Sequence, residues 1–155
     1  MTRSHPATTL TTAPGENSGP MPTPRTPARR PAGERDVHSR ALQISVVRPE
    51  PGLSLVQLRG EIDLSTTGRL AELIHQRMNA VALRGIVVDL TGITFCGSCG
   101  IELLVHAQCR AEHRDIAMHV VPGTGAVARM LDLVGIGERF RQHPDTAHAL
   151  AAARR

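Results

Sequence analysis

The amino-acid sequence predicts an α/β domain built on a mixed β-sheet. Short runs rich in Val, Leu and Ile alternate with segments whose apolar residues recur every three or four positions, the pattern of strands connected by helices. The first two runs are separated only by a turn, so the sheet should open with antiparallel strands. The later strands should follow right-handed crossovers through helices, and about four helices are expected in all.

Residues 1–40 differ in composition from the rest of the chain. They hold seven of the 11 prolines together with many Thr, Ser and Arg, and they have neither helical nor strand periodicity. Such a segment buries too little apolar surface to offset the entropy lost on ordering. The sequence therefore predicts a disordered Pro/Arg-rich tail over residues 1–40 and one folded domain over residues 41–155.

The domain should begin with a β-hairpin. Its strands are ALQISVVR (41–48) and LSLVQLRG (53–60), and the PEPG between them can continue neither strand. An amphipathic helix should follow, with Ser65, Thr66 or Thr67 as its N-cap. The residues at helical spacing in this segment are Leu70, Leu73, Ile74, Arg77 and Val81.

Two continuous apolar runs, residues 85–90 and 115–121, are typical of strands covered by helices. The helix between them should start at Ser98. A later helix should end at Gly135, a candidate left-handed cap, and residues 145–153 should add a terminal helix. His119 lies within the second apolar run, so we expect a hydrogen-bonded structural histidine there rather than a catalytic one.

The composition argues against several function classes. All 18 basic residues are arginine, so the chain lacks the lysine of a Walker A nucleotide-binding loop, and no catalytic triad is evident from spacing. The absence of Trp and Tyr removes the rings on which bases usually stack, so direct nucleic-acid binding is not expected. Because no long apolar run is present, we expect a cytoplasmic protein that binds no membrane. We also expect no cofactor, no metal and no enzyme activity.

The stretch TFCGSCGIELL (94–104) supports two hypotheses. Cys96 and Cys99 form a C-x-x-C pair before a helix, as in a thiol-disulfide redox site. Ser98 lies between them at the expected helix N-cap, where backbone N–H groups and the helix dipole would stabilise a phosphate. The redox hypothesis lacks the flanking Trp and the loop proline of thioredoxin-type sites. The cysteines are therefore expected to be packing residues, with a redox protein as the alternative. These residues alone leave Ser98 as either a plain structural N-cap or a phosphorylation site that switches a binding protein.

Three blocks together resemble the signature sequences of the STAS domain, specifically the stand-alone anti-sigma factor antagonists of bacteria. They are LRGEIDLSTTGRLAELI, IVVDLTGITFCGSCGIELL and GAVARMLDLVGIGERF. The resemblance spans roughly residues 42–153 and implies a sheet of four to five strands with the helices packed on one side. It also implies a partner in bacterial stress or sporulation-type signalling, an anti-sigma factor that is a serine kinase of the GHKL type. The unphosphorylated protein would capture this partner and release a sigma factor.

Carried over by position, the resemblance implies that Ser98 accepts the phosphate that ends this capture. The family block usually reads aspartate, serine, a small residue and glycine, whereas this chain has Gly97, Ser98, Cys99 and Gly100. The aspartate is missing, although Asp63 matches an acidic position near the same surface. A STAS scaffold or sensor protein that lost phosphorylation with this aspartate is a further alternative.

Two residues of the helix that starts at Ser98 are candidate partner contacts. Glu102 and Leu103 should fall beside Ser98 on the exposed side of this helix. With Asp63 and the four residues 97–100, they complete the predicted partner-binding surface.

Overall fold

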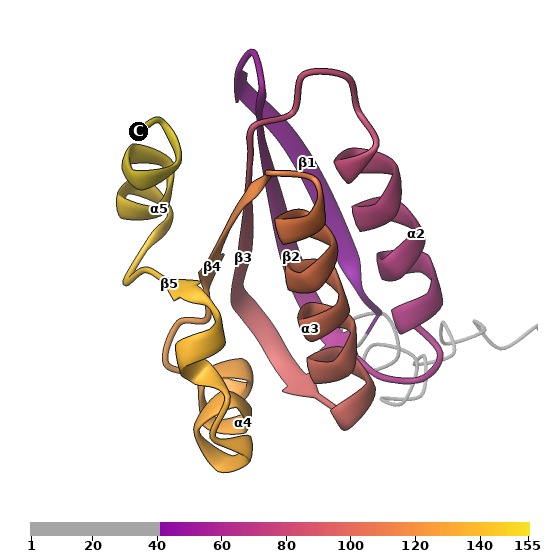
Figure 1. Ribbon diagram of the computed structural model, residues 1–155. Helices are drawn as coiled ribbons and strands as arrows, with labels where there is room; N and C mark the ends of the chain where they lie inside the picture. Colours follow the sequence, from indigo (N-terminus) through magenta and orange to yellow (C-terminus); the bar gives the residue numbers. More distant parts are fainter. Residues whose placement is uncertain (1–40) are drawn as a thin grey trace, which may run out of the picture. The chain divides into compact units, whose positions relative to one another are not determined.

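A five-stranded mixed sheet forms the centre of residues 41–155, the part of the chain that this computed structural model describes (Figure 1). The strands are β1 (Gln43–Glu50), β2 (Leu53–Ile62), β3 (Gly85–Cys96), β4 (Ala117–Val121) and β5 (Arg141–Gln142), and they lie in the sheet in this order. β1 and β2 pair antiparallel, and all later neighbours pair parallel. The predicted mixed sheet and hairpin are confirmed, whereas the tail predicted for residues 1–40 lies outside the described residues.

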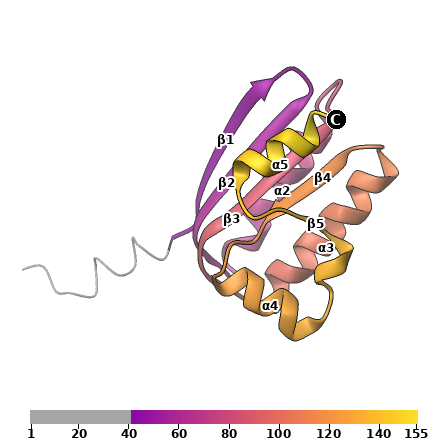
Figure 2. The same cartoon turned by 90° about the vertical axis from the view of Figure 1, so that its left-hand side faces the viewer.

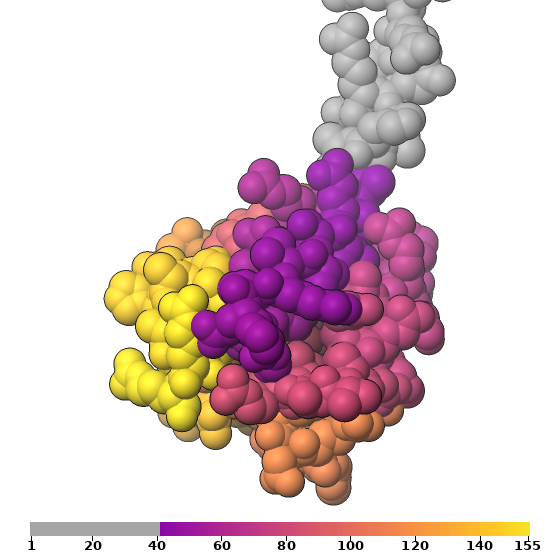
Figure 3. Space-filling model, turned by 90° about the horizontal axis from the view of Figure 1, so that it is seen from above, coloured from indigo at the N-terminus to yellow at the C-terminus, as the bar shows by residue number. Residues whose placement is uncertain are grey.

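Helices cover both faces of the sheet, not one face as expected. The helices are α2 (Thr67–Met78), α3 (Ser98–His113), α4 (Ala126–Val134) and α5 (Thr146–Ala153), with a 3-10 turn, η1, at Gly137–Arg139. α2, α3 and α4 pack on the face that includes Val56 and Val88, whereas α5 packs on the opposite face through Ala149. Figures 2 and 3 show α5 and α2 on opposite flanks of the sheet. Residues 85–90 are therefore buried from both sides, which explains their continuous apolar run.

β3 continues to Cys96, beyond the end at residue 90 that the apolar run predicts. The extension contains Thr91, Gly92 and Thr94, whose polarity or small size hides the strand in the sequence. β2 pairs with this extension as far as Ile62. At Gly92 a Cβ would lie 2.6 Å from the Arg59 side chain and 2.8 Å from the Leu58 carbonyl oxygen, so only glycine allows this approach. The extension carries both strands to the place where α3 begins.

The predicted helices are present, with differences at their ends. α2 begins after Thr66, one of the predicted caps, but Val81 lies beyond its end and is 98% exposed instead of facing the core. α4 ends at Gly135 in the left-handed conformation, as predicted, with φ of 72°. α5 begins after Asp145, whose carboxylate accepts a hydrogen bond from the backbone N–H of His148 at 2.8 Å.

His119 is buried and hydrogen-bonded, as the sequence indicates. It lies in β4, is 3% exposed, and its Nδ1 is 2.8 Å from Nε2 of His143. Burial, and after it the neighbouring His143 and Arg141, lower the pKa of His119 from its ordinary 6.5 to about 4. Between these values the unfolded chain binds a proton at this residue and the folded chain does not. Stability should therefore be lost as the pH falls through this interval.

We expect His119→Asn to reduce the acid sensitivity of the fold. Urea unfolding of the wild type should lose up to about 3 kcal/mol more between pH 7 and pH 4 than unfolding of the variant, because asparagine takes up no proton. Equal losses in the two proteins would show that His119 does not resist protonation in the folded state.

Candidate functional site

The predicted site lies where the parallel strands β2 and β3 end. Ile62 and Cys96, their last residues, are register partners, and the Gly97 backbone N–H donates a hydrogen bond to the Ile62 carbonyl oxygen at 2.9 Å. The β2–α2 loop and the start of α3 are therefore held side by side, at the lower end of the molecule in Figure 1. This pairing brings Asp63 into the neighbourhood of Gly97, as the family resemblance implied.

Ser98 is the first residue of α3 and is exposed. The sequence analysis placed Ser98 at the N-cap, and this was wrong. Gly97 occupies the N-cap position with extended backbone angles, and no side chain caps the helix. Within residues 41–155 the Ser98 hydroxyl has no hydrogen-bond partner. The hydroxyl is thus available to another molecule, while the uncapped N–H groups of the first turn and the helix dipole favour a negative charge nearby.

Asp63 organises its own loop. Its Oδ1 accepts hydrogen bonds from the Ser65 hydroxyl at 2.6 Å, the Ser65 backbone N–H at 2.9 Å and the Thr66 backbone N–H at 3.1 Å. The bond from the Ser65 hydroxyl, followed by these backbone bonds, lowers the pKa of Asp63 below its ordinary value. The carboxylate therefore stays ionised and fixes the loop that borders Ser98.

Gly100 lets α3 approach the strand ends closely. A Cβ on Gly100 would lie 2.7 Å from the Cys96 sulfur and 2.8 Å from Cγ2 of Ile62, and real Cβ atoms do not come so close. Gly97 is different, because a Cβ there would meet its neighbours at 3.5 Å or more. Packing therefore requires glycine at position 100, whereas position 97 has room for a side chain.

The sulfur chemistry of the C-x-x-C pair does not fit a redox site. Cys96 is buried against Gly100, and burial, with Cys99 as the smaller cause, raises the pKa of its thiol to about 11. A redox-active thiol needs the opposite shift, because the thiolate is the nucleophile. Cys99 is half-buried, and both are free thiols. The geometry therefore favours cysteines that pack the helix start.

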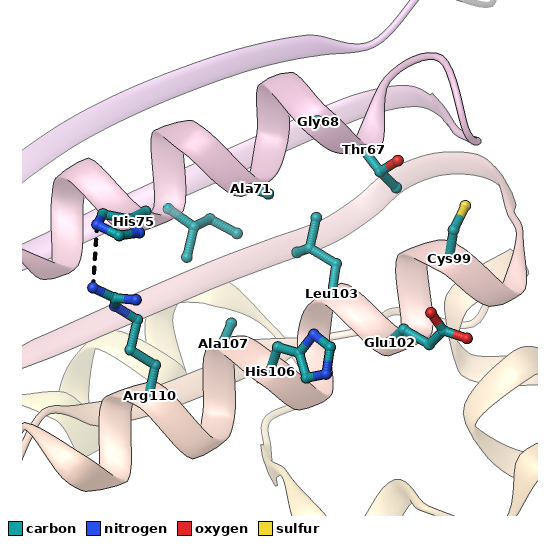
Figure 4. A pocket seen from close by; sticks show the side chains of 11 residues that line it. Thr67, Gly68, Ala71, His75, Cys99, Glu102, Leu103, His106, Ala107 and Arg110 are labelled. Atoms are coloured by element: carbon teal, nitrogen blue, oxygen red, sulfur yellow. Dashed lines mark hydrogen bonds between the residues drawn. The ribbon is translucent and has the colours of Figure 1, made fainter.

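Leu103 was expected on the exposed side of α3, but it lies on the buried side. It is 8% exposed and belongs to the core, where it points between α3 and α2 (Figure 4). It lines a groove of about 440 Å³ between the two helices, together with Thr67 of α2 and Cys99 of α3. Glu102 is exposed at the rim of this groove, as predicted. Leu103 can therefore reach a partner only through the groove.

Two exposed apolar side chains, on the two segments that meet at the start of α3, were missed from the sequence. Phe95 is 50% exposed at the end of β3, and its ring would lie 3.7 Å from a Cβ on Gly97. Leu64 is 86% exposed in the β2–α2 loop, next to Asp63. Phe95 is one of only two Phe, Tyr or Trp residues of the chain, and it lies two residues before Gly97. This position was the one sequence signal that could have pointed to it as a contact residue. Exposed apolar groups of this size are typical of protein interfaces.

The described residues form neither a metal-binding cluster nor a membrane-spanning helix. Among residues 41–155, no three His, Cys, Asp or Glu side chains gather closely enough to hold a metal ion. No helix in this same range is long and apolar enough to span a membrane.

Comparison with known proteins agrees with this architecture. The STAS domain family model matches residues 45–149. The anti-sigma-F factor antagonist RsfA of Mycobacterium tuberculosis is 30% identical over 115 residues, which cover 74% of this chain and 89% of that protein. RsfB of the same organism, also an anti-sigma-F factor antagonist, is 30% identical over 105 residues, covering 66% of this chain and 83% of RsfB.

Solved structures give the same result. An anti-sigma factor antagonist from Mycobacterium paratuberculosis superposes with a TM-score of 0.67 at 28% identity, covering 74% of this chain and 96% of that structure. Unphosphorylated SpoIIAA, also an anti-sigma factor antagonist, shares the fold with a TM-score of 0.60 at 15% identity, covering 72% of this chain and 96% of SpoIIAA. On the family match and the sequence identity to its relatives, this chain belongs to the STAS domain family.

Proposed function

We propose that the chain is an anti-sigma factor antagonist that binds its partner at the end of the sheet where α3 begins. The relatives named as antagonists support the class. One observation carries the location: an exposed serine without a hydrogen-bond partner at a helix start, where the segments that carry exposed Phe95 and Leu64 meet. This combination suits a surface that docks by apolar contact and is switched by a charge. The protein acts by binding, and Ser98 serves as a substrate rather than a catalyst.

The switch that we propose is phosphorylation of Ser98 by the partner itself, a GHKL-type serine kinase and anti-sigma factor. A phosphate brings about −1.5 to −2 charges. In the free protein the N–H groups at the start of α3 favour it, so the fold is retained. In the complex the phosphate would lose water beside Phe95 and Leu64, which cannot replace that hydration. The partner is released, and the sigma factor is recaptured in the cytoplasm.

The proposed contact surface comprises the seven residues inferred from the sequence and the two found in the structure. They are Asp63, Leu64, Phe95, Gly97, Ser98, Cys99, Gly100, Glu102 and Leu103. Their roles differ: Phe95 and Leu64 supply apolar area, Asp63 holds the loop, and Gly100 seats the helix. Leu103 and Cys99 contribute through the α2–α3 groove.

Ser98→Ala should bind the partner constitutively, and Ser98→Asp should bind at least about tenfold more weakly, or about 1.4 kcal/mol. Neither change should alter the free energy of unfolding by more than about 0.5 kcal/mol, because the hydroxyl caps nothing. Calorimetric titration with the partner gives both affinities. If the two variants bind equally well, the switch is not at Ser98 and the protein is a non-phosphorylated STAS binding protein.

Gly97→Asp should increase the rate of phosphate transfer to Ser98 without tightening capture. Its Cβ fits at ordinary contact distances, and the extended backbone at this position suits an aspartate N-cap, so the carboxylate would lie beside the acceptor serine. Phosphate incorporation from labelled ATP with the partner kinase measures this rate. An unchanged rate would mean that the missing aspartate does not limit the reaction.

Phe95→Ala should weaken partner binding by about 2 kcal/mol, as expected for an aromatic anchor of an interface. Val81→Ala is the matched control, because Val81 is also an exposed apolar residue but follows α2 at the other end of β3. Similar losses in the two variants would assign the effect to general surface changes rather than to docking at Ser98.

A further inference from the structure

A cluster of basic side chains lies at the β4–β5 edge of the sheet. β4, β5, α5 and the residues that follow α5 border an open cavity of about 480 Å³, lined by His119, Arg141, His143, His148 and Arg155 together with two small apolar residues. We call it the basic cavity. No Asp or Glu side chain of the described residues lines it.

The sheet register creates this cluster. His119 of β4 and Arg141 of β5 are register partners in a parallel pair, so their side chains project from the same face. Val121, two residues after His119, is covered by α5 on that face, which places His119 and Arg141 under the same helix. The backbone N–H of His143 donates to the Val120 carbonyl oxygen at 2.9 Å and fixes the third basic residue beside them.

The carboxylates around the basic cavity are already engaged. Asp145 accepts from the ring of His148 at 2.8 Å, Asp89 accepts from the Thr146 hydroxyl at 3.1 Å, and Glu50 pairs with Arg154 at 3.1 Å. Within residues 41–155, the guanidinium groups of Arg141 and Arg155 have no hydrogen-bond or ion-pair partner. No acidic side chain of the described residues therefore neutralises these two guanidinium groups.

One buried polar atom in the cluster lacks a partner as well. The His119 side chain is 3% exposed, its Nδ1 contacts His143, and its Nε2 has no hydrogen-bond partner. Leaving a buried polar atom unpaired costs about 1–3 kcal/mol. A ligand oxygen that reached this nitrogen would remove that cost.

We propose that the basic cavity binds a small soluble oxyanion of the phosphate class, either inorganic phosphate or a phosphate monoester. The planar guanidinium groups of Arg141 and Arg155 match phosphate oxygens in geometry and charge. His119 and His143 also line the cavity; His119 Nδ1 and His143 Nε2 contact each other, which leaves Nε2 of His119 and Nδ1 of His143 unpaired within residues 41–155. The position between a helix and the sheet edge suits a free anion better than a lipid headgroup.

Burial first, and after it the positive charge of His143 and Arg141, hold the pKa of His119 low in the free protein. The groups that line the cavity with it are Arg141 of β5, His143 of the loop after β5, His148 of α5 and Arg155 just after α5, with Asp145 bonded to His148. A bound anion would stabilise the imidazolium form, so the pKa of His119 should rise in its presence. A purely structural histidine pair would not respond in this way.

The test is titration of the full chain with inorganic phosphate at constant ionic strength, followed by amide and imidazole NMR shifts. We expect saturable shifts in β4, β5 and α5 with a millimolar dissociation constant, and an upward shift of the His119 pKa. The double variant Arg141→Gln, Arg155→Gln should weaken binding about tenfold, because it removes two charge-assisted contacts. Both side chains are exposed, so the variant should fold as the wild type does.

Arg154→Gln is the matched control, since Arg154 precedes Arg155 in the chain but pairs with Glu50. Its phosphate affinity should equal that of the wild type. Shifts that do not saturate, or that persist in the double variant, would overturn the proposal. Binding to vesicles containing phosphatidic acid without saturable binding of inorganic phosphate would also overturn it, in favour of a lipid headgroup.

Discussion

The close approach of α3 to the ends of β2 and β3 is the constraint on which the proposed interface depends. Gly100 lies where any Cβ would collide with Cys96 and Ile62, and the Gly97 N–H is bonded to the Ile62 carbonyl. These contacts fix the residue at which the helix begins. They leave Ser98 exposed at that point, next to the loop that Asp63 holds in place. A rigid frame thus presents a serine whose own side chain contributes no contact to the fold.

With this arrangement, the proposed modification of Ser98 would leave the fold of the domain intact. Gly97 occupies the N-cap position, and Gly100 packs against Cys96, so the Ser98 side chain is not needed for either role. The apolar neighbours Phe95 and Leu64 remain exposed in the free protein. A charge placed among them affects docking more than folding, because only docking removes their water. The basic cavity lies under α5, on the opposite face of the sheet from α2 and α3, so the two sites are built from different elements.

The fold was largely predictable because its helices and strands follow the hydrophobic periodicity of the sequence. Gly135 as a left-handed cap and the helix after Asp145 are examples of local signals that the structure confirms. The end of β3 was not predictable, because Thr91, Gly92 and Thr94 interrupt the apolar run and only pairing with β2 makes them a strand. The two-residue β5 and the face covered by α5 likewise depend on tertiary packing.

The candidate site was predicted in part. The place of Ser98 at the helix start followed from local sequence, but its capping role was wrong, because Gly97 lies one position earlier with extended backbone. Leu103 was assigned to the wrong side of α3, since the sequence does not reveal that α2 packs along that side. Exposure of Leu64 and Phe95 is a property of the folded surface and has no periodic signature. The seven predicted contact residues and the phosphorylation of Ser98 stay predictions.

Hydrogen–deuterium exchange of this protein with and without its anti-sigma factor tests the central claim, the location of the interface, most directly. The account predicts slower exchange in the complex over residues 63–67 and 95–103, with little change in α5. Protection confined to β5 and α5, with unchanged exchange at the start of α3, would contradict it.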